Sequence, residues 1–169
     1  MFVNKTVVRE CCGKSHFQFQ VTMNSNYQAT LNTFLRQNGI TDPTKVGEIA
    51  SGFDLSRPVY THLIHPGDRL FQFLRNEEMN RPFPQTGNWF CLPGANMDSL
   101  AIFGGGAGRR LQEFTVSRPV MALEGTAGPV RRNWGWAGGG RGGATQIFLP
   151  HSALLALVGI GTHLTQQSQ

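Results

Sequence analysis

The stretch GDRLFQFLRN, at residues 67–76, begins with a turn and continues as a strand. Its Gly-Asp pair favours a tight turn, and the side chains that follow alternate between the two faces of an extended chain. Arg69, Phe71 and Phe73 therefore share one face. A guanidinium is a planar, permanently charged donor for phosphate, and an aromatic ring packs against a flat heterocycle. The pattern indicates a face that can hold a dinucleotide; the alternative is an exposed arginine beside two core phenylalanines.

Short extended segments of this kind fill the chain after Pro58. Apolar runs bounded by turn-forming residues predict strands at 59–64, 69–74, 89–92, 113–123 and 145–149. Pro119 interrupts the fourth segment, which is then either an edge strand or two strands joined at a kink or bulge. The chain has 21 glycines, which gather at 104–106 and 138–140, and this favours short strands and many turns over long helices.

Helices are expected mainly in the first third of the chain. Residues 2–23 contain alternating apolar positions that predict a strand or hairpin. The polar residues at 25–26 can then cap a helix that ends at Gly39. Asp42, followed by proline, begins a second short helix that ends at Gly52.

These elements together predict an α+β fold with a compact, twisted and mostly antiparallel β-sheet and a small helical N-terminal part. Residues 1–57 are expected to form an extension or lid, and residues 58–169 the sheet domain, with both in one globular unit. Near the C-terminus, Ser152 can cap a last short helix, although a final strand fits nearly as well.

The formal charge of +5 and the pI near 9.6 suit an anionic partner. Arginines in the second half are spread among glycines and apolar residues, so no nucleic-acid partner is expected. The three cysteines include no CxxC pair and the five histidines no HExxH, so neither disulfides nor a metal site are predicted. We expect synthesis in a reducing cytosol. We also expect no secretory leader and no membrane insertion, because the apolar run at 153–160 is too short for a bilayer.

Two further segments carry candidate site residues. GNWF at 87–90 places Trp89 and Phe90 on opposite sides of a strand, so one ring can pack in the core while the other borders a cleft. Burial of both rings is the alternative. GGATQIFL at 142–149 holds a single amide, Gln146, among apolar residues. A buried amide needs partners, which are either a carboxamide or ribose hydroxyl of a ligand or backbone groups at a sheet edge. The glycine clusters form neither a GxxxxGK[ST] loop nor a GxGxxG unit, which disfavours nucleotide kinases and Rossmann enzymes.

Five segments, taken in order, resemble the tuberculosis-necrotizing-toxin (TNT) family of NAD⁺ glycohydrolases: GDRLFQFLRN, GNWFCLPG, LAIFGGGAGRR, LQEFTVSRPVMALEGTAG and GGATQIFLP. The wider ADP-ribosyltransferase-like toxins have a related order of elements. The resemblance covers residues 58–150 and leaves most of the N-terminal third unmatched. It implies a toxin domain that cleaves the nicotinamide–ribose bond of NAD⁺ or NADP⁺ as substrate, with no further cofactor.

The resemblance also implies roles for single residues. Arg69 and Gln146 are the implied catalytic residues, the first holding phosphate or ribose and the second lying at the ribose of the scissile bond. Trp89 or Phe90 would border the nicotinamide. Phe71 is expected to bind substrate from the strand pattern alone, because it shares a face with Arg69.

A second basic contact is implied at Arg109 or Arg110. The related transferases place a glutamate two residues after a late-strand Gln or Glu, whereas that position here is Phe148. Phenylalanine cannot accept a proton, which favours water over a protein side chain as the acceptor. Glu124 is then the carboxylate to test as a substitute.

A toxin of this kind implies a cognate immunity protein, expected to be acidic to suit the basic surface. It also implies synthesis in a bacterial cytoplasm, delivery by a specialised secretion system or within a larger polypeptide, and action in the cytosol of a target cell. Two alternatives stay open at this point. One is a mono-ADP-ribosyltransferase toxin that uses Glu124, and the other is a non-enzymatic basic adaptor for an acidic partner.

Overall fold

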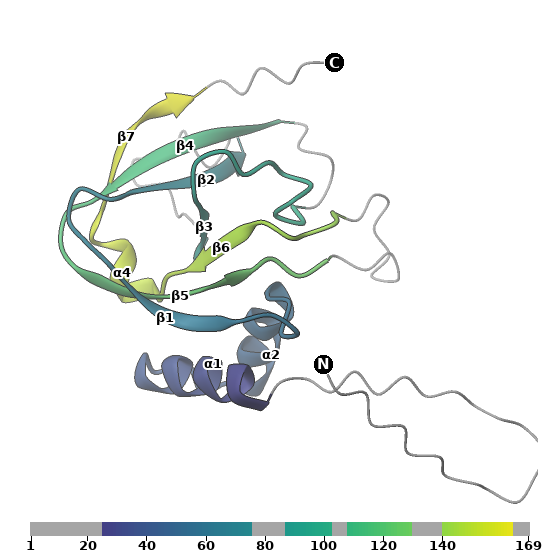
Figure 1. Ribbon diagram of the computed structural model, residues 1–169. Helices are drawn as coiled ribbons and strands as arrows, with labels where there is room; N and C mark the ends of the chain where they lie inside the picture. Colours follow the sequence, from purple (N-terminus) through teal and green to yellow (C-terminus); the bar gives the residue numbers. More distant parts are fainter. Residues whose placement is uncertain (1–24, 76–86, 103–107, 130–139, 164–169) are drawn as a thin grey trace, which may run out of the picture.

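An antiparallel sheet of seven strands carries most of the chain that the computed structural model describes, which comprises residues 25–75, 87–102, 108–129 and 140–163 (Figure 1). The strands are β1 (Val59–Ile64), β2 (Arg69–Arg75), β3 (Trp89–Cys91), β4 (Arg109–Val116), β5 (Val120–Thr126), β6 (Thr145–Phe148) and β7 (Leu157–His163). They lie in the order β1-β5-β6-β3-β2-β4-β7. The described helices are α1 (Ser25–Gln37), α2 (Pro43–Gly52) and α4 (His151–Leu154). The predicted α+β fold with an antiparallel sheet is confirmed.

The sheet has two halves that meet at a narrow seam. Strands β1, β5, β6 and β3 form one half, and β2, β4 and β7 form the other (Figure 1). Among the described residues, β2 and β3 share one register pair, Phe71 with Cys91. The connections from β1 to β2 and from β4 to β5 both cross from one half of the sheet to the other. They lie side by side, since the Gly67 N–H donates a hydrogen bond of 2.8 Å to the Val116 carbonyl. The seam is therefore the place where the strand ladder is weakest.

The strand register assigns each side chain to one of two faces, because cross-strand partners in an antiparallel sheet point the same way. The face we call the core face carries Leu70, Phe90 and Ile147, which belong to one buried apolar cluster together with residues of α4. The opposite face, which we call the cavity face, carries Phe71 and Gln146.

Helices α1 and α2 cover the cavity face of the four-strand half. Leu31 and Leu35 of α1 are fully buried against Val59 of β1 and Phe148 of β6. Burial of such side chains contributes about 1.5–3 kcal/mol each. The end of α2 lies against β3 and β6, where Gly52 meets Trp89 and Gln146.

The predicted N-terminal helices are both present. Helix α1 begins at the predicted cap position, and Gly39 beyond its end has a φ of 73°. The Asp42 side chain caps α2 by accepting a hydrogen bond of 2.9 Å from the backbone N–H of Lys45. The strand or hairpin predicted within residues 2–23 lies outside the described residues.

The segment predicted at 113–123 is two strands. β4 ends at Val116, β5 begins at Val120, and Pro119 lies in the connection between them. Neither strand is at an edge and the two are not neighbours, so the edge-strand prediction is wrong. The alternative prediction of two strands is confirmed, but their connection crosses between the halves of the sheet and is not a kink or bulge. At the C-terminal end a helix and a strand both occur, because the single turn of α4 is followed by β7. The cap predicted at Ser152 is wrong, since Ser152 lies within α4 and Pro150 holds its N-cap position.

The boundary predicted after residue 57 falls between α2 and β1, and the division into an extension and a sheet domain stays a prediction. Within the described ranges no helix is both long enough and apolar enough to cross a bilayer; α1, for example, has 13 residues.

Candidate active site

A cavity of about 240 Å³ lies at the seam of the sheet. Its walls come from both halves of the sheet and from the segment that follows β3, and they are mainly apolar and aromatic. Two amides, an indole, a thiol and a guanidinium supply the polar groups of the side chains among the described residues. The lining residues are Phe71, Gln72, Phe73, Leu74, Gly87, Trp89, Phe90, Cys91, Leu100, Ile102, Arg109 and Gln146.

One cross-strand row runs past the cavity on the cavity face. Phe71 of β2 pairs with Cys91 of β3, and Cys91 pairs with Gln146 of β6. On its other side Phe71 pairs with Glu113 of β4. Arg69 lies two residues before Phe71 on the same strand and so projects from the same face. The structure thus brings Arg69, Phe71 and Gln146 to one face. At the usual spacing of neighbouring strands, the row from Glu113 on β4 to Gln146 on β6 is about 14 Å long.

The end of α2 holds Gln146 in place. Gln146 is 7% exposed, and its Nε2 donates a hydrogen bond of 2.9 Å to the carbonyl oxygen of Gly52. This carbonyl is at the C-terminal end of the helix, where such groups lack partners within the helix. Since the amide nitrogen is engaged there, Oε1 of Gln146 is the atom left to accept a hydrogen bond from a ligand.

Gly52 also fixes the position of Trp89. A Cβ on residue 52 would lie 2.6 Å from Cη2 of Trp89 and 3.3 Å from Nε2 of Gln146, so any larger residue must displace them. The indole packs edge-on against Phe53 and Phe148, with ring centroids 5.1 and 5.2 Å away. These contacts leave Trp89 half-buried, with part of its surface on the cavity.

Phe90 points away from Trp89. Its buried ring packs edge-on against Phe114 on the core face, with centroids 5.7 Å apart. Of the two arrangements that the sequence left open, one ring in the core and the other at a cleft is the one observed. Phe90 also contributes part of the cavity wall.

Arg69 forms an ion pair with Glu113, in which Nη1 lies 3.1 Å from Oε1. Glu113 is 5% exposed, whereas the Arg69 side chain is 66% exposed. Because Glu113 is the cross-strand partner of Phe71, the ion pair draws the guanidinium toward that row. Arg69 lies beside the cavity and does not line it. Its exposed donors suit an anionic group of a ligand that extends out of the cavity.

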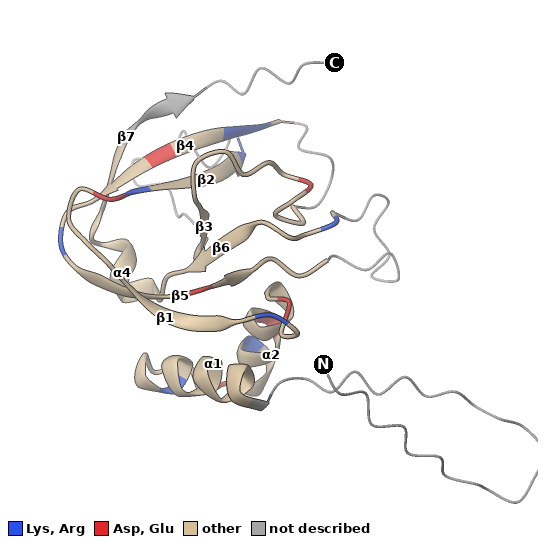
Figure 2. Ribbon diagram, viewed as in Figure 1, with Lys and Arg blue, Asp and Glu red and all other residues tan. Residues whose placement is uncertain are grey.

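Arg109 and Arg110, at the start of β4 where Figure 2 shows basic residues, point to different faces of the sheet. Arg109 lines the cavity, and its Nη1 donates a hydrogen bond of 3.1 Å to the carbonyl oxygen of Phe73. Arg110 is exposed and points to the other face, since its cross-strand partner is Leu74. Of the two predicted basic contacts, Arg109 is the one at the cavity.

Glu124 does not join the site. Its partner in β6 is Ile147, so Glu124 lies on the core face while Gln146 lies on the cavity face. Its buried carboxylate accepts a hydrogen bond from the Tyr60 hydroxyl and contacts Nδ1 of His62. The hydrogen bond to Glu124, and secondarily burial, raises the pKa of Tyr60 above its ordinary value. Glu124 therefore has partners within its own sheet and is not brought together with the predicted catalytic pair.

Cys91 lies in the middle of the row but is poorly suited to nucleophilic chemistry. Its Sγ is 3.3 Å from the carbonyl oxygen of Phe71, which accepts the thiol hydrogen. Burial raises the pKa of Cys91 to about 12, so the thiol is protonated at neutral pH. The side chains that line the cavity in the described ranges thus include positioning groups but no activated thiolate.

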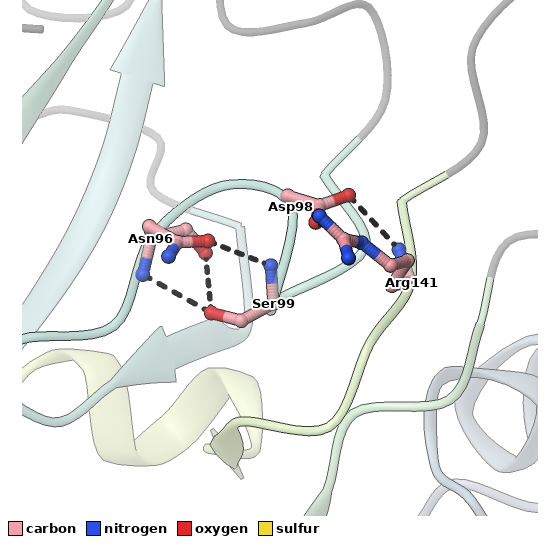
Figure 3. A network of polar contacts seen from close by, with 4 residues as sticks. All are labelled: Asn96, Asp98, Ser99 and Arg141. Atoms are coloured by element: carbon pink, nitrogen blue, oxygen red, sulfur yellow. Dashed lines mark hydrogen bonds and ion pairs between the residues drawn. The ribbon is translucent and has the colours of Figure 1, made fainter.

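The segment after β3 closes one side of the cavity and is braced by polar contacts (Figure 3). Backbone N–H groups of Asn96 and Ser99 each donate to the other residue's side-chain oxygen, at 3.1 and 2.8 Å. Asp98 pairs with Arg141, whose Nε lies 2.7 Å from Oδ2, and this hydrogen bond lowers the pKa of Asp98. The braced turn holds Leu100 against the cavity.

Several residues at the cavity were not singled out from the sequence. Gly52 gave no signal beyond ending a helix, and Leu100 reaches the cavity through long-range packing. Gln72, however, shows the same pattern that singled out Gln146, namely one amide in an apolar strand. Within the described residues, no group of three or more His, Cys, Asp or Glu side chains is arranged to hold a metal ion.

The sequence matches no protein-family model and no curated protein. Among solved structures, the chain is similar to the structure of Tse6 in complex with Tsi6, with a TM-score of 0.64 and 21% identity over 83% of this chain and 98% of that chain. It also aligns with Rhs1-CT in complex with its cognate immunity protein RhsI1, at 18% identity over 63% of this chain and 80% of that one, with a TM-score of 0.47. A third alignment is with Tne2 in complex with Tni2, at 13% identity over 67% and 96% of the two chains, with a TM-score of 0.49.

The conclusion from these alignments concerns the fold and rests on the Tse6 structure. That structure is matched over nearly its whole length, so the described sheet and helices form the same architecture. The resemblance to a TNT-like toxin domain is confirmed at the level of the fold.

Proposed function

We propose that this chain is a toxin-type NAD(P)⁺ glycohydrolase that cleaves the nicotinamide–ribose bond at the seam cavity. The observation that carries the proposal is the arrangement of one face of the sheet. Gln146, fixed by the Gly52 carbonyl, lines an aromatic cavity, and the ion-paired Arg69 lies beside that cavity on the same face. The resemblance of five sequence segments to the TNT family and the fold shared with the Tse6 structure support the same reading.

The size of the cavity suggests how the substrate is divided. Its volume of about 240 Å³ is below the roughly 300–1,000 Å³ of pockets that enclose a drug-sized ligand. One aromatic ring fits, and the rest of a dinucleotide must lie along the surface. In our proposal the nicotinamide enters between Trp89 and Phe71, and the pyrophosphate lies toward Arg69, whose exposed guanidinium matches phosphate geometry.

The reaction follows a dissociative course in this proposal. The bond between the nicotinamide nitrogen and ribose C1′ breaks, the electron pair stays with nicotinamide, and the ribose develops oxocarbenium character. Water adds to C1′ and loses a proton, which gives ADP-ribose. Nicotinamide leaves as a neutral molecule from a cationic ring, so no strong acid is needed to assist departure. Orientation and electrostatic fit then supply most of the rate enhancement.

Each named residue has a physical task in this scheme. The Oε1 of Gln146 accepts a hydrogen bond from a hydroxyl of the ribose, because Nε2 is held by the Gly52 carbonyl. Glu113 orients Arg69, and Arg109 adds positive charge at the far wall of the cavity. Water is the acceptor in this scheme, since position 148 carries phenylalanine and Glu124 lies on the other face.

We further propose a cognate immunity protein as the partner. The Tse6 structure contains Tsi6 in complex, and a chain with a formal charge of +5 suits an acidic partner. Synthesis in a bacterial cytoplasm, delivery by a secretion system or within a larger polypeptide, and action in the cytosol of a target cell complete the proposal.

The test is incubation of the purified protein with NAD⁺, followed by separation of the products. We expect equal amounts of nicotinamide and free ADP-ribose. If a cell extract is added and ADP-ribose becomes attached to a protein or nucleic acid in it, the protein is instead a mono-ADP-ribosyltransferase. Constant NAD⁺, together with salt-sensitive binding of an acidic protein, would indicate the non-enzymatic adaptor. Parallel incubation with NADP⁺ decides between the two dinucleotides.

A further inference from the structure

Gln72 presents a buried hydrogen-bond acceptor that has no partner among the described residues. The residue is 8% exposed and lines the seam cavity. Its Nε2 donates to the carbonyl oxygens of Gly87 and Trp89, at 3.0 and 2.9 Å. Its Oε1 is buried and has no hydrogen-bond partner in the part of the chain that the structure describes.

The two contacts of Nε2 fix the orientation of the amide. Both neighbours are carbonyl oxygens, so a flipped amide would place its own oxygen against two acceptors. The nitrogen therefore points to the backbone of β3. Beyond the pair Phe71 and Cys91, the described parts of β2 and β3 have no further register pairs, and the side chain of Gln72 bonds to the β3 backbone there instead. The oxygen is then the end of the side chain that is left to accept a hydrogen bond.

A buried acceptor without a donor lowers stability, and nearly all such groups in folded proteins are satisfied. A ligand that carries an N–H donor on a planar ring would satisfy this one, since the ring would lie against Phe71 and Trp89, which line the same cavity as Gln72. We propose that Oε1 of Gln72 accepts a hydrogen bond from the primary carboxamide of the nicotinamide ring and thereby selects this ring. The proposal rests on the proposed function, which places the nicotinamide in the same cavity as Gln146.

The first experiment changes the ligand and leaves the protein intact. Binding of nicotinamide, 3-acetylpyridine and adenine is measured by calorimetry. 3-Acetylpyridine is neutral and of nearly the same shape as nicotinamide, but its methyl ketone has no N–H donor. We expect nicotinamide to bind at least about tenfold more tightly than 3-acetylpyridine, because a site with a buried polar group rejects an analogue that leaves it unpaired. Equal affinities would overturn the proposal, and so would tight binding of adenine with none of nicotinamide.

The second experiment changes the acceptor. Gln72→Met keeps the length of the side chain and removes the amide, so the ratio of the two affinities is expected to fall to about one. Gln112→Met is the matched control, because Gln112 is the cross-strand partner of Gln72 on β4 and does not line the cavity. This control should keep the parental ratio. Retention of the full ratio by a folded Gln72→Met protein would overturn the proposal.

Two features keep the outcome decisive. The ratio within one protein does not depend on the fraction that is folded, and the unmodified protein decides the matter if Gln72→Met fails to fold. Selective binding of nicotinamide by a protein that does not hydrolyse NAD⁺ would support the role of Gln72 and contradict the proposed function. Hydrolysis of NAD⁺ without selection between the two rings would leave the proposed function standing and overturn the role of Gln72.

Discussion

The seam cavity and the cluster of Tyr60, His62 and Glu124 are two polar regions of the same sheet, one at the seam and the other between β1 and β5. In the cluster, both oxygens of the buried carboxylate are engaged by neighbours on β1. In the cavity, the side-chain nitrogens of Gln72 and Gln146 donate to backbone carbonyls, while within the described ranges no hydrogen bond is made by their side-chain oxygens.

In the proposed function, this difference separates a polar group that serves the fold from one that serves a ligand. A buried carboxylate with two partners in its own sheet is explained by the structure alone. A buried amide fixed at one end, beside an aromatic cavity and an exposed guanidinium, has its second partner still to be supplied. The comparison predicts that changes at the seam impair catalysis and that changes at the cluster affect mainly stability.

The largest effect is expected for Gln146→Ala. Loss of one preorganised hydrogen-bonding group at the reacting centre typically lowers kcat about 100-fold or more. Release of nicotinamide from NAD⁺ measures the rate, and thermal denaturation shows whether the variant is folded. Gln112→Ala, which removes an amide of β4 outside the cavity, should keep the parental rate. A parental rate in Gln146→Ala would refute the role assigned to this residue.

A second large effect is expected for Arg69→Gln. Loss of a charge-assisted hydrogen bond of roughly 2 kcal/mol lowers kcat/KM for NAD⁺ about 30-fold. The ion pair with Glu113 is also lost, so a fall in the melting temperature should accompany it. Arg110→Gln serves as the control, because Arg110 is exposed on the other face. Equal kcat/KM values for the two variants would contradict the assignment of Arg69.

Gly52→Ala tests the contact between α2 and the site. The new Cβ would lie 2.6 Å from the indole of Trp89 and must displace it, so we expect activity to fall about tenfold and stability by about 1–3 kcal/mol. Gly47→Ala lies on the same helix with nothing within 4 Å of its Cβ and should gain about 0.5–1 kcal/mol at unchanged activity. Similar activities in both variants would mean that α2 does not position the site.

Glu124→Gln should leave the hydrolysis of NAD⁺ unchanged and lower stability by about 1 kcal/mol. The pKa of Tyr60 is raised mainly by its hydrogen bond to Glu124, so in the variant it should return toward 10.0. In the parent, the corresponding stability is present below pH 10.0 and is lost as the pH rises through the higher pKa of the folded state. Tyrosinate absorbance against pH and chemical denaturation measure the two effects. A strong loss of activity would favour the transferase reading.

The smallest effect is expected for Arg141→Gln. The Asp98–Arg141 pair is exposed, so its loss should change kcat little and reduce the melting temperature slightly at pH 7. Arg141 lowers the pKa of Asp98 below 3.8, so the advantage of the parent should persist above that pH and disappear as the pH falls through the lowered value. Melting temperatures of both proteins at pH 7 and at pH 2.5 test this.

The sequence predicted the elements of the fold because their signals are local. Alternation along strands and the Asp42 cap need no information from distant parts of the chain. The division at Pro119 into two strands in different halves of the sheet is a matter of topology, which periodicity does not encode. For the same reason the sequence predicted the segments that form the sheet but not their order.

The site was predicted in part for a similar reason. Arg69 and Gln146 stand out as polar residues in apolar strands, and the register places both on one face. The strand register decides which of Arg109 and Arg110 faces the cavity, and likewise which of Gln146 and Glu124 does so. A sequence with several turns leaves this register undetermined. Gly52 became visible only through a contact between residues 94 positions apart, its bond to Gln146.

The most direct test of the central claim is a crystal structure of the Gln146→Ala protein with NAD⁺ bound. We predict the nicotinamide ring in the seam cavity against Trp89, with the pyrophosphate on the side of Arg69. A dinucleotide bound elsewhere, for example at Tyr60, His62 and Glu124, with the seam cavity unoccupied, would contradict the account.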